Sequence, residues 1–202
     1  MAEIKTICVY CGSSPGRDGR YVDVAKALGK ILGQQKINLV FGGGGVGLMG
    51  AVARAARDSG SEVTGIIPEF LVNRERPEAA HSTRTVVTKD MHERKRKMFE
   101  LADAFVALPG GIGTLEELVE QLTWIQLGQH QKPLLILNVN GFWDPLLALL
   151  ANFRDLGFVG QHAIDNLLVA ERVEDVLPRL RSAAAPVTLW SLREDQAVTE
   201  NM

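Results

Sequence analysis

Apolar and polar positions follow one another along the chain in two different rhythms. Short continuous apolar runs are typical of strands covered on both faces, whereas apolar residues at helical spacing indicate helices with one buried side. The apolar runs predict strands over residues 5–10, 37–41, 62–67, 84–88, 104–108, 133–139 and 166–170. The helical spacing predicts helices over residues 21–34, 51–59, 91–102, 115–127, 143–156 and 173–180. This order predicts an α/β fold of the Rossmann-like type, a parallel sheet with helices on both faces.

A single domain accounts for this pattern, because no repeat or linker interrupts it. We expect that domain over residues 1–182, a surface loop over residues 68–80, and a loose C-terminal tail over residues 183–202. The length of 202 residues allows a full core, and the net charge of −2 argues against bulk binding of nucleic acid. The sequence enters a strand pattern without a signal peptide and has no apolar run that could span a bilayer. We therefore expect a cytoplasmic protein that binds neither nucleic acid nor membranes.

The two cysteines, Cys8 and Cys11, form a C-x-x-C pattern. Redox pairs of this kind normally open a helix, but these residues lie within or at the end of the first predicted strand. Residues three apart on a strand point to opposite faces, so we favour apolar packing over a redox or metal site.

The most informative stretch is Pro109-Gly110-Gly111-Ile112-Gly113-Thr114-Leu115-Glu116-Glu117. It joins a predicted strand to a predicted helix, and the free N–H groups and positive dipole end of a helix suit a phosphate. We expect Thr114 to be the N-cap of that helix. In the competing interpretation, Thr114 and Glu117 form a T-x-x-E capping box and bind nothing. A capping box needs no preceding glycines and does not explain the cations at residues 94–97, so we favour a phosphate site.

A second glycine-rich turn, over residues 42–50, competes with the first. Its Gly45-x-Gly47-x-x-Gly50 pattern, with Glu69 roughly twenty residues further on, matches the dinucleotide fingerprint and suggests an NAD-dependent oxidoreductase. No dehydrogenase constellation accompanies it. Residues 12–16 form a third loop, which either contacts a ligand or simply turns the chain. All three loops follow strands, and ligands of parallel sheets bind beyond the carboxyl ends of the strands.

The motif that ends at Glu117, together with Met91-His92-x-Arg94-Lys95-x-x-Met98, resembles the Lonely Guy (LOG) family from Cys8 to about Arg181. The resemblance implies a cytokinin-activating phosphoribohydrolase, a homodimer that acts on a nucleoside monophosphate. The reaction that the resemblance implies is expected to need no cofactor or metal. The family is often labelled as lysine decarboxylases, but that reaction needs a lysine bound to pyridoxal phosphate, and nothing marks Lys89, Lys95 or Lys97 as one.

The resemblance also implies residue roles. Arg94 and Glu117 are expected to be catalytic. The residues expected to bind the substrate are Ser13, Gly43, Gly44, Glu75, Met91, Lys95, Gly110, Gly111, Ile112, Gly113, Thr114, Leu115, Glu116 and Thr123. The spacing from Glu75 to Arg94 is one residue shorter than in plant members. Helices beside the site form the dimer interface in such relatives, which makes Trp124, Ile125 and Leu127 either interface residues or ordinary core.

The expected reaction is hydrolysis of an N6-modified adenosine 5′-monophosphate, or of AMP, to the free base and ribose 5-phosphate. Breaking an N-ribosyl bond builds positive charge on the sugar, which a carboxylate such as Glu117 can stabilise while it orients or deprotonates water. Arg94 more plausibly fixes the phosphate or ribose and orients Glu117, or assists departure of the base. A noncatalytic nucleotide or cofactor carrier on the same fold is the main alternative, and it would bind AMP without turnover.

Overall fold

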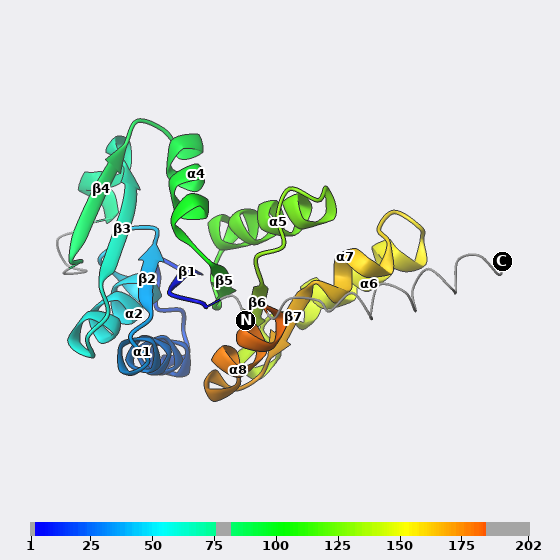
Figure 1. Ribbon diagram of the computed structural model, residues 1–202, viewed down its shortest axis with the longest axis horizontal. Coiled ribbons are helices and arrows are strands. Elements are labelled where there is room, and N and C mark those ends of the chain that lie inside the picture. The colour runs from blue at the N-terminus through cyan, green and yellow to red at the C-terminus, as the bar shows by residue number, and fades with distance from the viewer. Residues whose placement is uncertain (1–2, 76–81, 185–202) are drawn as a thin grey trace.

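The computed structural model describes residues 3–75 and 82–184, and its strands form one parallel sheet in the order β4-β3-β2-β1-β5-β6-β7 (Figure 1). The expected α/β Rossmann-like fold is therefore confirmed. The strands are β1 (Thr6–Tyr10), β2 (Asn38–Phe41), β3 (Val63–Pro68), β4 (Arg84–Thr88), β5 (Ala104–Ala107), β6 (Leu134–Leu137) and β7 (Leu167–Ala170). All seven predicted strands are present, each within about two residues of its expected bounds.

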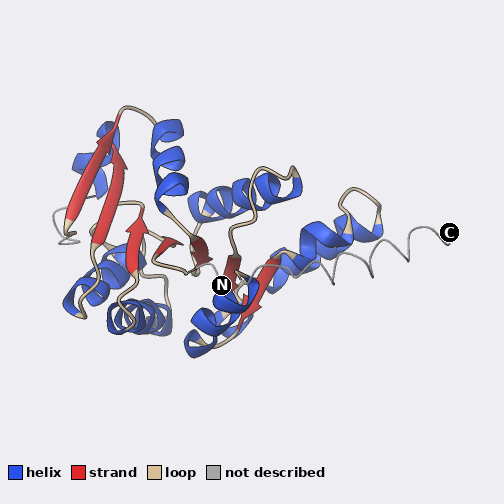
Figure 2. Cartoon of the chain, viewed as in Figure 1, coloured by secondary structure: helices blue, strands red, loops and turns tan. Residues whose placement is uncertain are grey.

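The helices lie between the strands in the sequence and on both sides of the sheet in space (Figure 2). They are α1 (Gly19–Gln34), α2 (Gly47–Asp58), α3 (Val72–Glu75), α4 (Met91–Leu101), α5 (Ile112–Gln126), α6 (Asp144–Asp155), α7 (Gln161–Asp165) and α8 (Val176–Ala183). Three short 3₁₀ turns are also present in the described part of the chain, η1 (Glu69–Leu71), η3 (Val139–Gly141) and η4 (Val173–Asp175).

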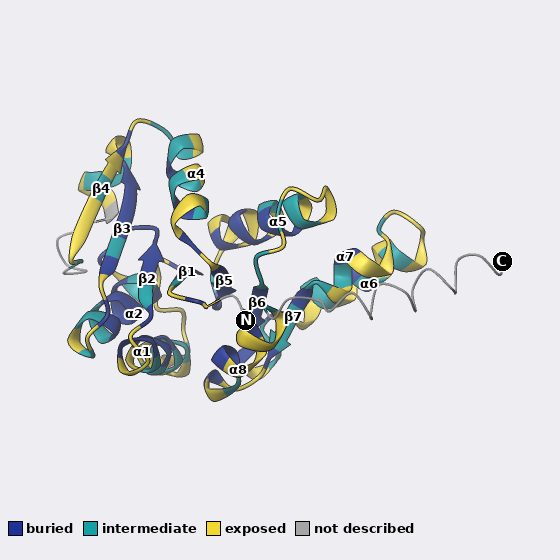
Figure 3. Ribbon diagram, viewed as in Figure 1, coloured by how far each residue is buried: buried dark blue, intermediate teal, exposed yellow. Residues whose placement is uncertain are grey.

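Alternate residues of each strand enter two different cores. Ile7 and Val9 pack with α1, α2 and α8 on one face, whereas Cys8 and Tyr10 pack with α4 and α5 on the other. Cys11 belongs to the first core, so the two buried thiols face opposite sides and remain unbonded. Figure 3 shows the central strands buried between half-exposed helices, whereas the edge strand β4 is largely exposed. The alternation explains why the central strands read as continuous apolar runs.

Several predicted boundaries were wrong, and their causes lie in tertiary contacts. The helix α2 begins at Gly47, not at residue 51, because the Gly12 carbonyl accepts hydrogen bonds from the Leu48 and Met49 N–H groups. The segment predicted as a loop over residues 68–80 contains η1 and α3, and residues 76–80 lie outside the described part of the chain. The short helix α7 was not predicted. The expected tail from residue 183 falls mostly outside the described residues.

The order of the strands places a crevice beside β1. The chain runs from β1 through β2 and β3 to β4 on one side, and then returns to add β5, β6 and β7 on the other. Loops that leave the carboxyl ends of β1 and β5 therefore diverge to opposite faces. Such a switch point is where parallel sheets bind ligands.

Candidate functional site

A cavity of about 320 Å³ lies at the carboxyl ends of β1, β2 and β5. Its walls come from the three glycine-rich loops, from α4, and from the first two turns of α5. The predicted site residues that line it are Ser13, Met91, Arg94, Gly111, Ile112, Gly113, Thr114 and Glu117. Three loops and two helices that are far apart in the sequence thus meet in one hollow.

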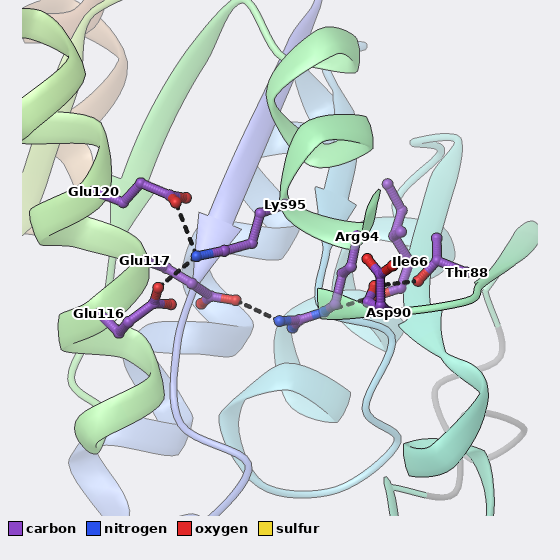
Figure 4. Close-up of polar contacts among 8 residues, drawn as sticks. All are labelled: Ile66, Thr88, Asp90, Arg94, Lys95, Glu116, Glu117 and Glu120. Atoms are coloured by element: carbon purple, nitrogen blue, oxygen red, sulfur yellow. Dashed lines mark hydrogen bonds and ion pairs between the residues drawn. The ribbon is translucent and has the colours of Figure 1, made fainter. Parts of the chain in front are cut away.

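An ion pair between Arg94 and Glu117 forms the buried wall of the cavity (Figure 4). The Arg94 Nη1 donates to the Glu117 Oε1 at 2.8 Å, and both side chains are only 9% exposed. The Arg94 Nε donates to the Ile66 carbonyl of β3 at 3.1 Å. Because two donors of the same guanidinium are fixed by different elements, the arginine has one defined position beside the carboxylate.

The protonation of Glu117 is set by two opposing effects. Burial raises the pKa of Glu117 above its usual range, because a carboxylate loses its hydration there, and the charge of Arg94 pulls the pKa back down. The neighbouring Glu116 adds a smaller upward effect. A carboxyl whose pKa is raised above its usual range and whose partner is a fixed cation is a candidate for proton transfer.

Lys95 is occupied by two carboxylates of α5. Its Nζ donates to Glu116 at 2.5 Å and to Glu120 at 2.8 Å (Figure 4). Burial alone would lower the pKa of Lys95, but the two carboxylates outweigh it and raise the pKa. The side chain is 13% exposed and does not line the cavity. Lys95 therefore fastens α4 to α5 and orients Glu116.

We predict that Lys95→Met destabilises the fold by about 1–2 kcal/mol, because the partly buried Glu120 and the half-exposed Glu116 lose their common charged donor. Chemical denaturation followed by circular dichroism measures this change. Lys97→Met is the matched control on the same helix, since Lys97 has only a 3.4 Å ion pair with Glu93 at a more exposed position. Equal stability of the two variants would contradict the role of Lys95 in fastening α4 to α5.

The helix α5 begins with unused hydrogen-bond donors. Gly111 is its N-cap residue and provides no side-chain cap. The N–H groups of Ile112, Gly113 and Thr114 make no hydrogen bond within the described residues. Thr114 is buried in the first turn of the helix, so its prediction as N-cap was wrong, and Glu117 caps nothing because it pairs with Arg94. A helix start of this kind is suited to binding an anion through its backbone donors.

The start of α2, which carries the dinucleotide fingerprint, is already occupied. The Gly12 carbonyl accepts from its Leu48 and Met49 N–H groups at 3.0 and 3.3 Å. A Cβ atom on Gly47 would lie 2.3 Å from the Ser13 backbone, and one on Gly50 would lie 2.1 Å from the Gly45 carbonyl. These glycines permit close packing between loops, and the helix start has no free donors at these positions for a pyrophosphate.

Several predicted binding residues lie outside the cavity. Gly43, Gly44, Gly110, Leu115, Glu116 and Thr123 do not line it. The Thr123 hydroxyl donates to the Val119 carbonyl on an exposed part of α5. Glu75 ends α3, and its side chain lies outside the described part of the structure.

Sequence reasoning missed part of the cavity wall. Gly42, Met49 and Leu71 line it, together with Val9 and Cys11. Gly42 could have been found because it is the first residue after β2. Leu71 could not, because the segment around it was read as a loop, and Met49 was assigned to a turn.

The fold and the site define a Rossmann-like α/β protein with a buried Arg–Glu pair and a helix N-terminus without a side-chain cap at the switch point of its sheet. A family model described as "possible lysine decarboxylase" matches residues 49–180. The cytokinin riboside 5′-monophosphate phosphoribohydrolase LOG of Oryza sativa subsp. japonica is 43% identical over 96% of this chain and 80% of its own length. The phosphoribohydrolase of the same name from Rhodococcoides fascians is 44% identical over 88% of this chain and 90% of its own. The chain belongs to this family, the LOG family.

A solved structure shows the breadth of the fold. The molybdenum cofactor binding protein of Rippkaea orientalis has a TM-score of 0.67 over 90% of this chain and 98% of its own, at 21% identity. At that identity the likeness concerns the fold alone.

Proposed function

We propose that the protein hydrolyses the N-glycosidic bond of a cytokinin nucleotide, an N6-modified adenosine 5′-monophosphate, or of AMP. The products are the free base and ribose 5-phosphate. The observation that carries the proposal is that the buried Arg94–Glu117 pair faces the same cavity as the unused N–H groups at the start of α5. A phosphate site and an ionisable carboxylate then face a single substrate. The names of the relatives, all phosphoribohydrolases, support the same reaction.

We expect the nucleotide to bind in the cavity in one orientation, with its phosphate at the start of α5. The 5′-phosphate binds at the N–H groups of Ile112, Gly113 and Thr114, where the helix dipole is positive. Glu117 lies five residues after Ile112, about 7.5 Å further along the helix axis. A nucleotide laid along this line brings its ribose C1′ toward the Glu117 carboxylate. The base then extends toward the apolar side chains of Met49, Leu71 and Met91.

Glu117 is the catalytic carboxylate in this arrangement. As the bond between C1′ and the base nitrogen breaks, its electron pair leaves with the base and the ribose becomes an oxocarbenium ion. The Glu117 carboxylate stabilises that charge and accepts a proton from the attacking water, whose oxygen bonds to C1′. The departing base takes up a proton from the solvent, and Glu117 afterwards returns the proton it accepted to the solvent, so that one water is consumed for each bond broken. Arg94 holds the carboxylate in the ionised form and in position.

Side-chain cations play a small part in phosphate binding. Arg94 is paired with Glu117, and Lys95 with Glu116 and Glu120. Among the described residues, the donors that remain are the backbone groups of α5 and the hydroxyls of Ser13 and Thr114, which line the cavity. No lysine of the described ranges 3–75 and 82–184 lines the cavity, which leaves decarboxylation through a lysine-bound pyridoxal phosphate without a residue there to support it.

We predict that Thr114→Val raises KM for the nucleotide about tenfold, because a hydrogen bond to a charged group is lost at an unchanged side-chain volume. Steady-state kinetics with AMP and with adenosine measures the effect. Thr114→Ser keeps the hydroxyl and is the matched control, with a KM near that of the wild type. An equal rise in KM for adenosine, which has no phosphate, would place the hydroxyl elsewhere.

The direct test is incubation of the pure protein with AMP and with N6-isopentenyl-AMP, followed by chromatography of the products. Release of the free base with ribose 5-phosphate, and its loss in Glu117→Gln, supports the proposal. Tight binding of the nucleotide with no base released would overturn it in favour of a carrier. The relative rates of the two substrates establish the preferred base.

We further propose that the protein acts as a homodimer in the cytoplasm. Leu115, Val119 and Leu127 are 37%, 41% and 65% exposed at intervals of four or eight residues along α5 and its C-cap, a pattern that suits a second copy of the chain. Trp124 instead packs edge to face on Phe99 and is partly core. Light scattering of the purified protein tests whether it is a dimer.

Two unpaired buried thiols are consistent with a reducing compartment. No helix among the described residues is long and apolar enough to cross a membrane.

A further inference from the structure

The backbone of Gly42, at the carboxyl end of β2, lies against the guanidinium of Arg94. The guanidinium occupies the space that a side chain at position 42 would need. A Cβ atom on Gly42 would lie 2.2 Å from the Arg94 Nη2 and 3.1 Å from the Met49 Sδ. Real Cβ atoms essentially never have a non-bonded contact below 3.0 Å, so the 2.2 Å contact would force an atom to shift. The flat guanidinium therefore lies against a bare backbone, in the space that any other residue would fill.

Two strands, β2 and β3, and the helix α5 together define the position of the Arg94 guanidinium. Its Nε donates to the Ile66 carbonyl of β3, its Nη1 donates to Glu117 of α5, and its Nη2 lies against Gly42 just after β2. Moving the group away from Gly42 would strain or break one of the two hydrogen bonds. The bond to Glu117 is the one that the reaction uses.

Gly42 differs in kind from the glycines that follow it. Gly43 has a φ of +78°, and Gly47 has a φ of +60°, so an L-residue would strain the backbone at either position. Gly42 has no such φ, and the closest atom to its added Cβ belongs to the end of a flexible side chain. Alanine at position 42 thus acts on Arg94 more than on the fold.

We propose that Gly42 is a positioning residue for the hydrolysis: its missing side chain allows the Arg94 guanidinium to reach Glu117. This inference rests on the proposed function of the Arg94–Glu117 pair. Gly42→Ala pushes the guanidinium aside and leaves the Glu117 carboxylate buried without its full partner. The phosphate site at α5 is untouched.

The first test is the kinetics of Gly42→Ala. We expect kcat to fall at least tenfold with KM within about twofold of the wild type. The acidic limb of the pH–rate profile moves to higher pH, because the cation that lowers the pKa of Glu117 has moved away. Gly160→Ala is the matched control, since nothing lies within 4 Å of a Cβ atom at that position. A Gly42→Ala enzyme with wild-type kcat and pH profile would overturn the proposal.

The second test is a double-mutant cycle with Arg94→Lys. A lysine has no Nη2 atom to collide with a Cβ at position 42, so Gly42→Ala should change kcat less than twofold in the Arg94→Lys background. The same tenfold loss in both backgrounds would mean that Gly42 acts through the fold, and would contradict the proposal. Thermal unfolding of all four proteins measures any general destabilisation.

A readout that needs no activity separates this inference from the proposed function. The Arg94 Nε–H group is bonded to the Ile66 carbonyl and gives a ¹⁵N–¹H resonance that Arg94→Lys identifies by its absence. We expect Gly42→Ala to shift this resonance and Gly160→Ala to leave it in place. If the wild type released no base, the proposed function would fail while a shifted resonance would still establish the contact. An unshifted resonance in Gly42→Ala would sink the contact itself.

Discussion

Glu117→Gln is expected to reduce kcat for the nucleotide about 10³-fold with little change in KM. The substitution keeps the shape of the side chain and an oxygen that can accept from Arg94, but removes the charge and the base. General base catalysis and charge stabilisation by one group contribute rate factors of this size. Quantifying the released base under saturating substrate measures the loss. Glu100→Gln, the same exchange at an exposed position of α4, is the control.

The stability of Glu117→Gln distinguishes catalysis from folding. Because the pKa of Glu117 is raised in the folded protein, its contribution to stability is fully present below the unfolded pKa and is lost as the pH rises through the folded pKa. An amide does not ionise and escapes this loss. The lost ion pair with Arg94 acts in the opposite direction, so at neutral pH the variant should unfold at a temperature close to that of the wild type. An inactive variant that is also unfolded would leave Glu117 a structural residue.

Arg94→Ala has the second largest expected effect. It removes the partner of a buried carboxylate, and breaking a buried pair in this way costs about 3–5 kcal/mol. The remaining Glu117 takes up a proton at higher pH, because the cation that lowered its pKa is gone. We expect kcat to fall by at least 10²-fold near neutrality and the acidic limb of the pH–rate profile to move upward.

Arg94→Lys separates the two parts of this loss. Lysine keeps a positive charge but cannot donate to Ile66 and Glu117 from one rigid plane. Part of the stability should return, whereas most of the activity should not. Full activity in Arg94→Lys would mean that only the charge of Arg94 matters, and unchanged turnover in Arg94→Ala would remove it from the mechanism.

Local sequence patterns were enough to predict the sheet, because its central strands are buried on both faces and read as uninterrupted apolar runs. The same patterns were misleading at helix starts. The pattern predicted Thr114 as the N-cap and allowed a capping box with Glu117, yet the N-cap of α5 is Gly111 and Glu117 turns toward α4. Whether a carboxylate caps its own helix or pairs with Arg94 depends on a neighbour that local spacing does not reveal.

The site was predictable only where its residues follow strands. The loops after β1, β2 and β5 had to meet at one edge, and they do. The roles of individual cations did not follow in the same way. Residues 94 and 95 both looked like phosphate ligands, but only the structure shows Lys95 committed to Glu116 and Glu120. Packing between α4 and α5 decides this, and it involves residues more than twenty positions apart.

The unused N–H groups at the start of α5 have a consequence for how the protein tolerates change. A side chain that binds phosphate can be lost through one nucleotide substitution, but the N–H groups of Ile112, Gly113 and Thr114 belong to the main chain and survive nearly every exchange. They also carry no net charge that salt could screen as strongly as a lysine. With the phosphate bound there as proposed, a substitution of Leu71 in the cavity wall should leave phosphate binding unchanged. A chain built this way can change its preference for the base without losing its proposed phosphate site.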